Sequence, residues 1–407
     1  MTKQFYYGLN DYEAYLNQNM VTWSDLQNSG PNNLTGWDQP NGWARNTYAT
    51  GTITNYVPGD TYLNTPAGIG VYNNWNNFSI YGSIGGGQHA LATQSDGSLW
   101  SWGNNAYGQL GVGSVTNQST PIHIGMSAWR SIAAGQVSSH AVRSDGSMWC
   151  WGYNGYGQLG MGNTTNLSSP VQVGSELNWQ SVSASTAVIA VKNDGTMWGW
   201  GYNSNYQLGL GDTVNRSTPV QIGSGNLWKS VYVGLYSVVA IAQNGTLWGW
   251  GNNAQGELGL GYFSSVTTPV MISSSSWKSA AVANQHILYL NSDGSLWSCG
   301  VNASGELGDG TITQKNNLVQ VGKLSNWQSV AVISKDSYGG ASFGIKTDGT
   351  VWGWGSNVYS QLTTSLGTGI SLSTPIQIGS GNNWRSISAG YHCTIATYWP
   401  MVFNSQG

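Results

Sequence analysis

Histidine is the residue type in this chain whose recurrence could build a metal site. Four histidines fall at or near one position of a sequence pattern that repeats about every 50 residues, and imidazole is a common ligand of zinc and nickel. They are His89, His140, His286 and His392. The other repeats carry different residues there, so no complete ring of ligands is expected. We therefore expect these histidines to recur because the fold recurs, and we expect no metal and no cofactor.

Paired carboxylates are the second arrangement that could do chemistry. Glu257 and Glu306 could serve as the carboxylate pair of a glycosidase, which needs carboxyl groups roughly 5–9.5 Å apart. They occupy equivalent places in successive repeats, where other repeats carry glutamine, so we expect a structural role at a larger separation. No nucleophile elbow or phosphate-binding loop is present. The sequence therefore predicts a non-enzymatic protein with no catalytic residue.

A tandem repeat must position all of these side chains. The string Asp-Gly-Ser/Thr-x-Trp-x-Trp-Gly begins at Asp96 and returns five more times, with Asn244 in place of Asp once and Cys299 in place of the second Trp once. A Trp also opens a short alternating segment seven times, first at Trp75 and last at Trp384. A repeat of this length with several short strands is typical of a propeller blade.

The recurring motif predicts a hairpin followed by a strand. Asp-Gly suits a type I′ turn, in which both central residues adopt positive φ. The two Trp of Trp-x-Trp share one face of a strand, because side chains alternate. We expect the following residues to build the blades: Trp100, Trp102, Trp149, Trp151, Trp198, Trp200, Trp248, Trp250, Trp297, Trp352, Trp354, Gly97, Gly146, Gly195, Gly245, Gly294 and Gly349.

The seventh blade must combine both ends of the chain. The sequence contains seven Trp-opened segments but only six complete Asp-Gly hairpins. The last repeat reaches Gly407 before its Trp-x-Trp strand. Residues 42–51 and 64–70 resemble the missing parts, with 64–70 matching the outer, Pro-containing strand. The expected fold is all-β, a seven-bladed β-propeller closed by N- and C-terminal strands that share one blade. We assign residues 37–407 to the propeller and residues 1–36 to an N-terminal arm.

Residues 96–111 and their five counterparts closely resemble the repeat of the regulator-of-chromosome-condensation family. The resemblance covers residues from about 43 to 404 and implies a seven-bladed propeller. One family member is a nucleotide-exchange factor for a small GTPase, which uses an inserted wedge and a basic tail. Neither feature is apparent in this sequence. The resemblance therefore implies the fold but not that activity.

Charge is scarce in this sequence. Only 7% of the residues are charged and the net charge is -3, against about 25% charged residues in an ordinary soluble domain. This composition argues against nucleic acid as a partner. No apolar stretch approaches the ~20 residues of a membrane helix, and the N-terminal segment shows no secretory signal. A propeller does not require an uncharged surface, so the low charge points to function.

The loop after Trp-x-Trp-Gly contains the candidate binding residues. An Asn stands two residues after the Gly in all six repeats, and we expect it to be a left-handed turn residue. Two residues later the position varies, as a recognition surface would. The candidate binding residues are Tyr107, Tyr156, Asn205, Gln255, Ser304 and Tyr359.

Three functions remain open from the sequence. The first is a structural and interaction protein on the external surface of a virion, such as a bacteriophage decoration, tail or fibre-associated protein that docks through the arm. The second is a lectin-like module that binds a host-surface glycan or receptor. The third is a regulatory propeller in the cytoplasm that binds a protein partner.

Overall fold

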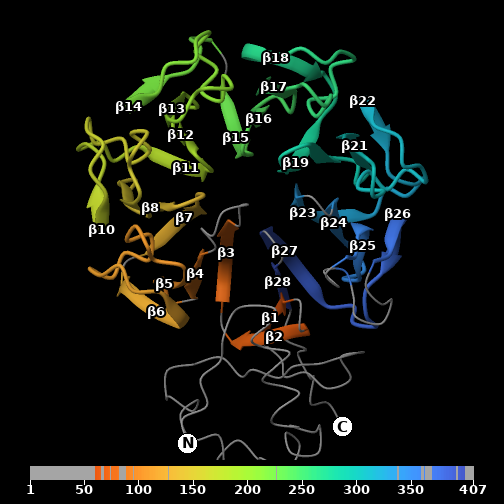
Figure 1. The fold of residues 1–407 in the computed structure, drawn as a ribbon, viewed down its shortest axis with the longest axis horizontal. Helices are drawn as coiled ribbons and strands as arrows, with labels where there is room; N and C mark the ends of the chain where they lie inside the picture. Colours follow the sequence, from red (N-terminus) through yellow and green to blue (C-terminus); the bar gives the residue numbers. More distant parts are fainter. Residues whose placement is uncertain are drawn as a thin grey trace, which may run out of the picture.

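The chain forms a ring of blades around a central axis (Figure 1). The computed structural model describes residues 60–65, 68–73, 75–81, 89–94, 96–126, 128–225, 227–336, 339–358, 362, 369–390 and 393–398. These residues contain seven antiparallel sheets, each with four strands. The predicted seven-bladed, all-β propeller is confirmed.

Each blade uses its strands in the same order from the axis outward. The first strands, nearest the axis, are β3 (Trp75–Tyr81), β7 (Trp129–Ala134), β11 (Trp179–Ala184), β15 (Trp228–Val233), β19 (Trp277–Val282), β23 (Trp327–Asp336) and β27 (Trp384–Gly390). The second strands are β4 (His89–Gln94), β8 (Ser138–Arg143), β12 (Ala187–Lys192), β16 (Ser237–Ala242), β20 (His286–Asn291), β24 (Gly339–Lys346) and β28 (Cys393–Tyr398).

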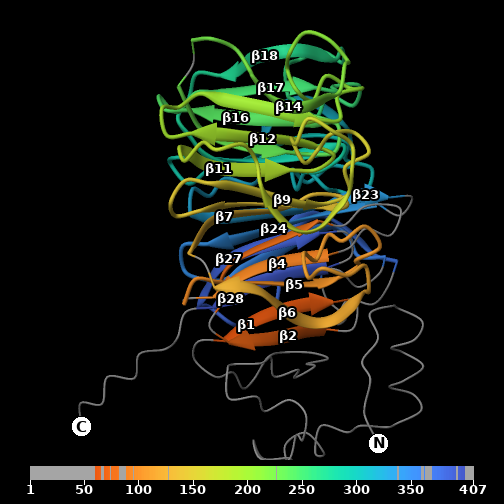
Figure 2. The same cartoon turned by 90° about the vertical axis from the view of Figure 1, so that its left-hand side faces the viewer.

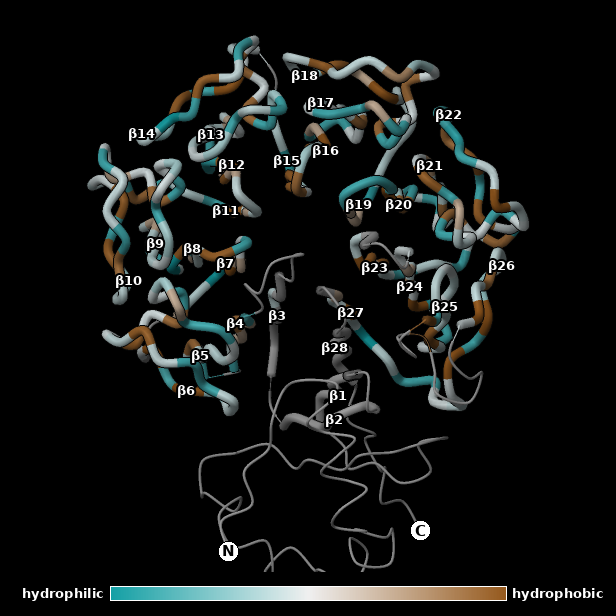
Figure 3. Tube along the Cα trace, in the orientation of Figure 1, coloured by the Kyte–Doolittle hydropathy of each residue, from teal (hydrophilic) through white to brown (hydrophobic). Residues whose placement is uncertain are grey.

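The outer half of each blade contains the Trp-x-Trp strand and the Pro-containing strand. The third strands are β5 (Ser98–Gly103), β9 (Met148–Gly152), β13 (Met197–Gly201), β17 (Leu247–Gly251), β21 (Leu296–Gly300), β25 (Val351–Ser356) and β1 (Asp60–Thr65). The fourth strands are β6 (Gln118–Met126), β10 (Leu167–Gln172), β14 (Arg216–Gln221), β18 (Val266–Ser273), β22 (Lys315–Gln320), β26 (Ser371–Gln377) and β2 (Gly68–Asn73). Apolar residues recur along the strands of successive blades (Figure 3).

The last blade joins the two ends of the chain, as predicted. Its strand order is β2-β1-β28-β27, and β27 contacts β3 of the first blade. The assignment of residues 64–70 to one outer strand is wrong, because β1 and β2 divide this segment and pair with each other antiparallel. Thus β1 takes the Trp-x-Trp place although it contains no Trp. Residues 42–51 and the arm, residues 1–36, lie outside the described part of the chain.

The core lies between neighbouring blades. The second strands β12 and β16 are buried along their whole length, because adjacent blades cover both faces of each sheet. A strand covered on both faces favours a continuous apolar run over alternation, which explains Ala-Val-Ile-Ala-Val at residues 187–191. Trp151, Trp200, Trp250 and Trp354 are fully buried, each beside the second strand of its own blade. Such burial is what the proposed packing role of the second Trp requires.

The Asp-Gly hairpin differs from the predicted type I′ turn. Gly146 N donates to Arg143 O at 3.0 Å, so Ser144 and Asp145 are the central residues of the turn. Positive φ occurs at Gly146 (φ 87) and not at Asp145. This is a three-residue loop whose last residue is left-handed, a type I turn followed by a bulge. The glycine is needed as predicted, but one position later in the turn.

The Asp is retained for its side chain. Asp145 Oδ1 accepts hydrogen bonds from Ser147 N (2.8 Å) and Ser147 Oγ (2.6 Å), and Ser147 Oγ in turn accepts one from Trp149 Nε1 (2.9 Å). The same relay forms in all six hairpins, with Asn244 replacing Asp in one of them. The motif is thus a hydrogen-bonded unit that fixes the half-buried first Trp.

Candidate binding face

The connections between strands divide the disc into two faces, which the edge-on view shows at the ends of the strands (Figure 2). The loop between the third and fourth strands bonds to the turn between the first and second, as in Tyr153 N to Val137 O at 2.9 Å. We call this side the loop face. The Asp-Gly hairpins and the connections between blades lie on the opposite side, the hairpin face, where Ser144 N donates to Ala128 O at 2.8 Å.

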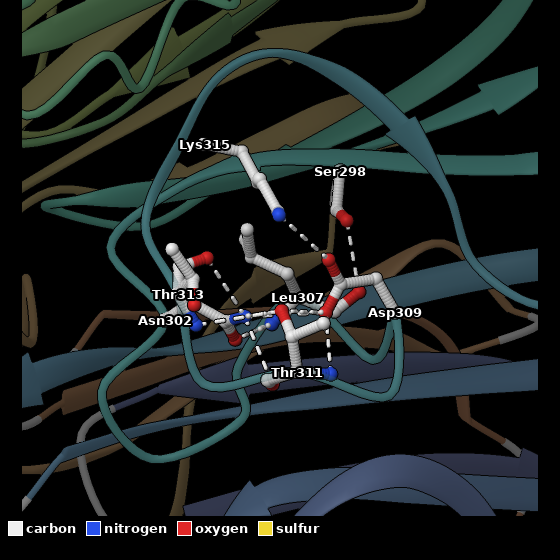
Figure 4. Close-up of polar contacts among 7 residues, drawn as sticks. All are labelled: Ser298, Asn302, Leu307, Asp309, Thr311, Thr313 and Lys315. Carbon is white, nitrogen blue, oxygen red and sulfur yellow. Dashed lines mark hydrogen bonds and ion pairs between the residues drawn. The ribbon is translucent and has the colours of Figure 1, made fainter.

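The recurring Asn holds the long loop of the loop face together from inside. Asn302 Oδ1 accepts from Leu307 N at 2.9 Å, and its Nδ2 donates to Thr311 O (3.0 Å) and Thr313 O (3.1 Å) (Figure 4). Asn154 and Asn203 make the same three contacts in their own loops and are fully buried. The prediction of a left-handed Asn is wrong, because none of the described ones has positive φ.

The variable position is fixed by a second buried side chain. Tyr156 N donates to Gln158 Oε1 at 2.8 Å, and Ser304 N donates to Glu306 Oε2 at 2.8 Å. The equivalent bond forms at Tyr107, Asn205 and Gln255. The loops therefore present side chains of different chemistry from a common, rigid backbone. Tyr107 and Tyr156 are 42% and 41% exposed, and Asn205, Gln255 and Ser304 are half-buried. Tyr359 lies outside the described residues.

The structure brings two of the predicted tyrosines into a row with two others. The ring centroid of Tyr107, in the β5–β6 loop, lies 4.9 Å from that of Tyr153 in the β9–β10 loop. The ring centroid of Tyr153 lies 5.9 Å from that of Tyr156 in its own loop. Tyr156 lies 4.8 Å from Tyr202 of the β13–β14 loop. We call these four residues the tyrosine row; it crosses three consecutive blades. Asn205, Gln255 and Ser304 have no place in it.

Sequence analysis missed Tyr153 and Tyr202. Both directly follow the Gly of Trp-x-Trp-Gly, a position outside the variable one. Gly155 could have pointed to Tyr153, because a Cβ added at Gly155 would lie 2.0 Å from the Tyr153 hydroxyl oxygen. The loop thus leaves space for that phenol. Burial, assisted by the neighbouring Tyr156 and Tyr107, raises the pKa of Tyr153, so its hydroxyl remains a neutral donor near pH 7.

The three loops that bear the row are almost without charge. Their one charged residue is Asp212, which forms an ion pair of 2.7 Å with Arg216. In the fifth blade Asp309 is likewise paired, at 3.8 Å, with Lys315. Three cations interact with aromatic rings. Arg143, Lys192 and Lys346 each lie over two indole rings, and the charged group is 3.3–4.0 Å from the centroid of the nearer ring. The scarcity of charge therefore extends to the loop face.

The histidines are bonded to serines. His89 Nε2 lies 2.8 Å from Ser139 Oγ, whose hydroxyl donates to Gln109 O, so the imidazole donates to the serine. His286 bonds Ser342 in the same manner at 3.0 Å. His140 is not at the repeat position of His89. His89 pairs with Gly103, whereas the residue paired with the equivalent Gly152 is Ser138, two residues before His140. Burial lowers the pKa of His140 to about 3. His392 lies outside the described residues.

The two glutamates accept hydrogen bonds from backbone N–H groups. Glu257 Oε2 accepts from Gln255 N at 2.9 Å, whereas its Oε1 is buried without a hydrogen-bond partner. Burial raises the pKa of Glu257 to about 7. Both oxygens of Glu306 accept backbone N–H bonds, from Ser304 and Gly340. These carboxylates thus replace the loop-fixing glutamine of other blades.

The described residues include no group of three or more His, Cys, Asp or Glu side chains arranged to hold a metal ion. They also include no helix of the length and apolar character needed to cross a bilayer. Both observations concern the described ranges alone.

Comparison with known proteins agrees with the repeat and the fold. The family model "Regulator of chromosome condensation (RCC1) repeat" matches residues 96–142, 145–189, 194–241, 244–290 and 348–397, and a second model of this repeat matches 129–158. Among curated proteins, the ultraviolet-B receptor UVR8 of Arabidopsis thaliana is 45% identical over 40 residues, which is 10% of this chain and 9% of that protein. The match to UVR8 therefore spans one short part of its length.

Two solved structures share the architecture at low identity. Prp20p of Saccharomyces cerevisiae matches with a TM-score of 0.71 and 19% identity, covering 86% of this chain and 94% of that one. Human WBSCR16 matches with a TM-score of 0.69 and 17% identity, covering 81% and 87%. The repeat matches extend over more than half of the chain. The chain belongs to the family of regulator of chromosome condensation (RCC1) repeat proteins.

Proposed function

We propose that this protein is a non-enzymatic binding propeller whose loop face contacts a protein partner. One observation carries the proposal: a buried Gln or Glu fixes the backbone of the variable residue identically in five loops, at 2.8–2.9 Å. Tyr, Asn, Gln and Ser thereby vary on a common scaffold. A fixed backbone with varied side chains reduces the entropy lost on binding, and loops on a rigid scaffold are where binding residues concentrate.

Two further points support a protein partner. Tyr residues with a polar hydroxyl and an apolar ring are enriched at interfaces. Prp20p, whose fold this chain shares, has a structure reported together with its binding to Gsp1p and histones. A propeller of this type can therefore present a surface to other proteins.

Affinity capture with the full chain tests this proposal. Asn205→Arg places a charge on the loop face, and Leu227→Arg places one at a 55% exposed site on the hairpin face as the matched control. We expect one stoichiometric protein to be captured by the wild type and by Leu227→Arg, and to be lost with Asn205→Arg. Equal capture by both variants would exclude the loop face.

A second candidate is an external virion protein, as a phage decoration, tail or fibre-associated component. It is supported by the 7% charge, a composition that the fold does not require, and by the ion-paired state of the loop-face carboxylates Asp212 and Asp309. In this proposal residues 1–36 dock to the particle and the loop face points outward. Mass spectrometry of purified virions tests it, and detection of the chain solely as a free cytoplasmic monomer would reject it.

A further inference from the structure

We propose that the tyrosine row is the docking site for an extended, uncharged, proline-rich segment of the partner; this inference rests on the proposed function. The row consists of Tyr107, Tyr153, Tyr156 and Tyr202. It is distinguished from scattered surface aromatics by three successive ring contacts of 4.8–5.9 Å across three blades.

The shape of the row favours a ridged ligand. Adjacent rings are inclined to each other by 57–76°: the two contacts of Tyr153 are edge-to-face and the contact between Tyr156 and Tyr202 is tilted. The row therefore does not present a run of coplanar ring faces. A sugar ring stacks best on an open aromatic face, and the contacts between neighbouring phenols reduce the area of ring face that is open. Proline-rich segments instead dock in aromatic-lined grooves. At about 3.1 Å per residue in the polyproline II conformation, each step of the row corresponds to about two residues.

The polarity of the row matches the same ligand. A polyproline II segment has no internal hydrogen bonds, so its carbonyl groups remain available as acceptors. Phenol hydroxyls supply donors at the ends of apolar rings. The surrounding loops carry the single charged residue Asp212, already paired with Arg216, so the site offers nothing to attract a charged segment. An uncharged partner segment is therefore preferred.

A strained residue in the third loop of the row provides an independent observation. Tyr206 has φ 63, and it is the one non-glycine residue with positive φ among those described. Its N–H bonds Asn203 O, a bond that Gly108, Gly157, Gly256 and Gly305 make in the other loops. Strain of this kind concentrates at functional sites. The chain thus retains an unfavourable backbone at a tyrosine of the loop that also carries Tyr202.

The test uses the full chain and fluorescently labelled decaproline, with a Gly-Ser peptide of equal length as the negative probe. Anisotropy should show saturable binding of decaproline alone. Tyr156→Ala, which removes the ring that contacts both Tyr153 and Tyr202, should weaken binding at least 10-fold. Tyr262→Ala is the matched control, because Tyr262 is 43% exposed on the loop face outside the row, and it should change binding less than twofold. Thermal unfolding confirms that both variants fold.

Three outcomes would overturn the inference: no saturable decaproline binding up to millimolar concentration, equal weakening by Tyr156→Ala and Tyr262→Ala, or row-dependent binding of a neutral oligosaccharide without peptide binding. The proposed function fails separately. If Asn205→Arg abolishes partner capture while decaproline does not bind, the loop-face proposal stands and the proline-rich ligand is rejected. If decaproline binds the row but Asn205→Arg does not reduce partner capture, the tyrosine row still binds proline-rich segments and the loop-face proposal is rejected.

Discussion

The indole nitrogen of Trp200 donates a hydrogen bond of 2.9 Å to the backbone carbonyl of Gln158 in the preceding blade. Trp151, Trp250 and Trp354 make the same bond to Gln109, Gln207 and Glu306. In the fifth blade Cys299 replaces this Trp, and its Sγ lies 2.9 Å from Glu257 O. The bond therefore links each of these blades to its predecessor, and it also anchors the residue that fixes the variable loop position.

Removing this donor should destabilise the ring. We expect Trp200→Phe to lower the free energy of unfolding by about 2–4 kcal/mol, because it leaves a buried carbonyl unpaired and a small cavity. Trp198→Phe is the control, since Trp198 bonds the half-exposed Thr196 Oγ1 at 3.0 Å, and should cost less than half as much. Urea unfolding measures both. Equal losses would contradict a special role for the inter-blade bond.

The hairpin relay should make stability depend on acid. Hydrogen bonds from Ser147 lower the pKa of Asp145, and those from Thr196 lower that of Asp194. A carboxyl whose folded pKa is depressed contributes stability above its unfolded pKa, about 3.9, and loses it as pH falls through the folded value. We therefore expect the urea concentration at the unfolding midpoint to decrease when the pH is lowered below 4.

The natural Asn supplies the control for this dependence. Asn244 accepts the same two bonds from Thr246 without a titrating group. Asp194→Asn should therefore reduce the acid-induced loss, and Asn244→Asp should increase it. Urea midpoints measured from pH 6 to pH 2.5 report both. Identical pH profiles for the wild type and the two variants would show that the relay does not govern acid stability.

Glu257 should act in the opposite direction. Its pKa is raised to about 7 by burial, above the unfolded value of about 4.3, so the folded state binds more protons and stability falls as pH rises from about 4 through about 7. Glu257→Gln removes this effect. It should stabilise the protein by an amount on the order of 3 kcal/mol above pH 8, and by little near pH 4.

Glu306 provides the matched comparison for that variant. Both of its oxygens accept backbone N–H bonds, so Glu306→Gln places an NH₂ group against a donor. We expect it to destabilise at neutral pH, where Glu257→Gln stabilises. Thermal midpoints across the pH range measure the pair. Destabilisation by both variants above pH 8 would show that burial does not raise the pKa of Glu257.

Tyr206 should be a site where stability and binding conflict. Tyr206→Gly removes a left-handed tyrosine and should raise the free energy of unfolding by about 1 kcal/mol. Gly157→Ala at the equivalent position should destabilise, because the added Cβ would lie 2.5 Å from Ser217 Cα. Chemical unfolding measures both. If Tyr206→Gly destabilises, the tyrosine is a packing residue and its strain has no functional meaning.

Ring closure should depend on the C-terminal strands. β28 pairs with β27 and with β1, so deleting residues 393–407 removes a strand from the middle of the shared blade. This exposes two sheet edges and opens the ring. We expect the thermal midpoint to fall by at least 10 °C, with concentration-dependent association. An unchanged midpoint by calorimetry would rule out this closure.

The repeat allowed most of the fold to be predicted, because each blade repeats the same local solution. Seven Trp-opened segments are the seven innermost strands, and the split blade followed from counting them. Local geometry was harder. Asp145 does lie in the turn, but the sequence does not show the side-chain bonds for which Asp145 and Asn154 are retained, because the proximity of the bonded atoms depends on the folded loop.

The candidate site was half visible in the sequence. Tyr107 and Tyr156 stand out because they vary at a fixed repeat position, but Tyr153 and Tyr202 occupy another position of the repeat. Ring contacts between blades depend on how far neighbouring loops are rotated about the axis. Repeat spacing does not specify that rotation.

The sequence by itself determined the repeat, the number of blades and the scarcity of charge, since these depend on residue identity and on short-range patterns. The tertiary structure decided which side chains meet across blades: Trp200 with Gln158, His89 with Ser139, and Tyr156 with Tyr202. These pairs lie 42–50 residues apart along the chain. Only the radial stacking of sheets, which buries both faces of each blade, brings them into contact.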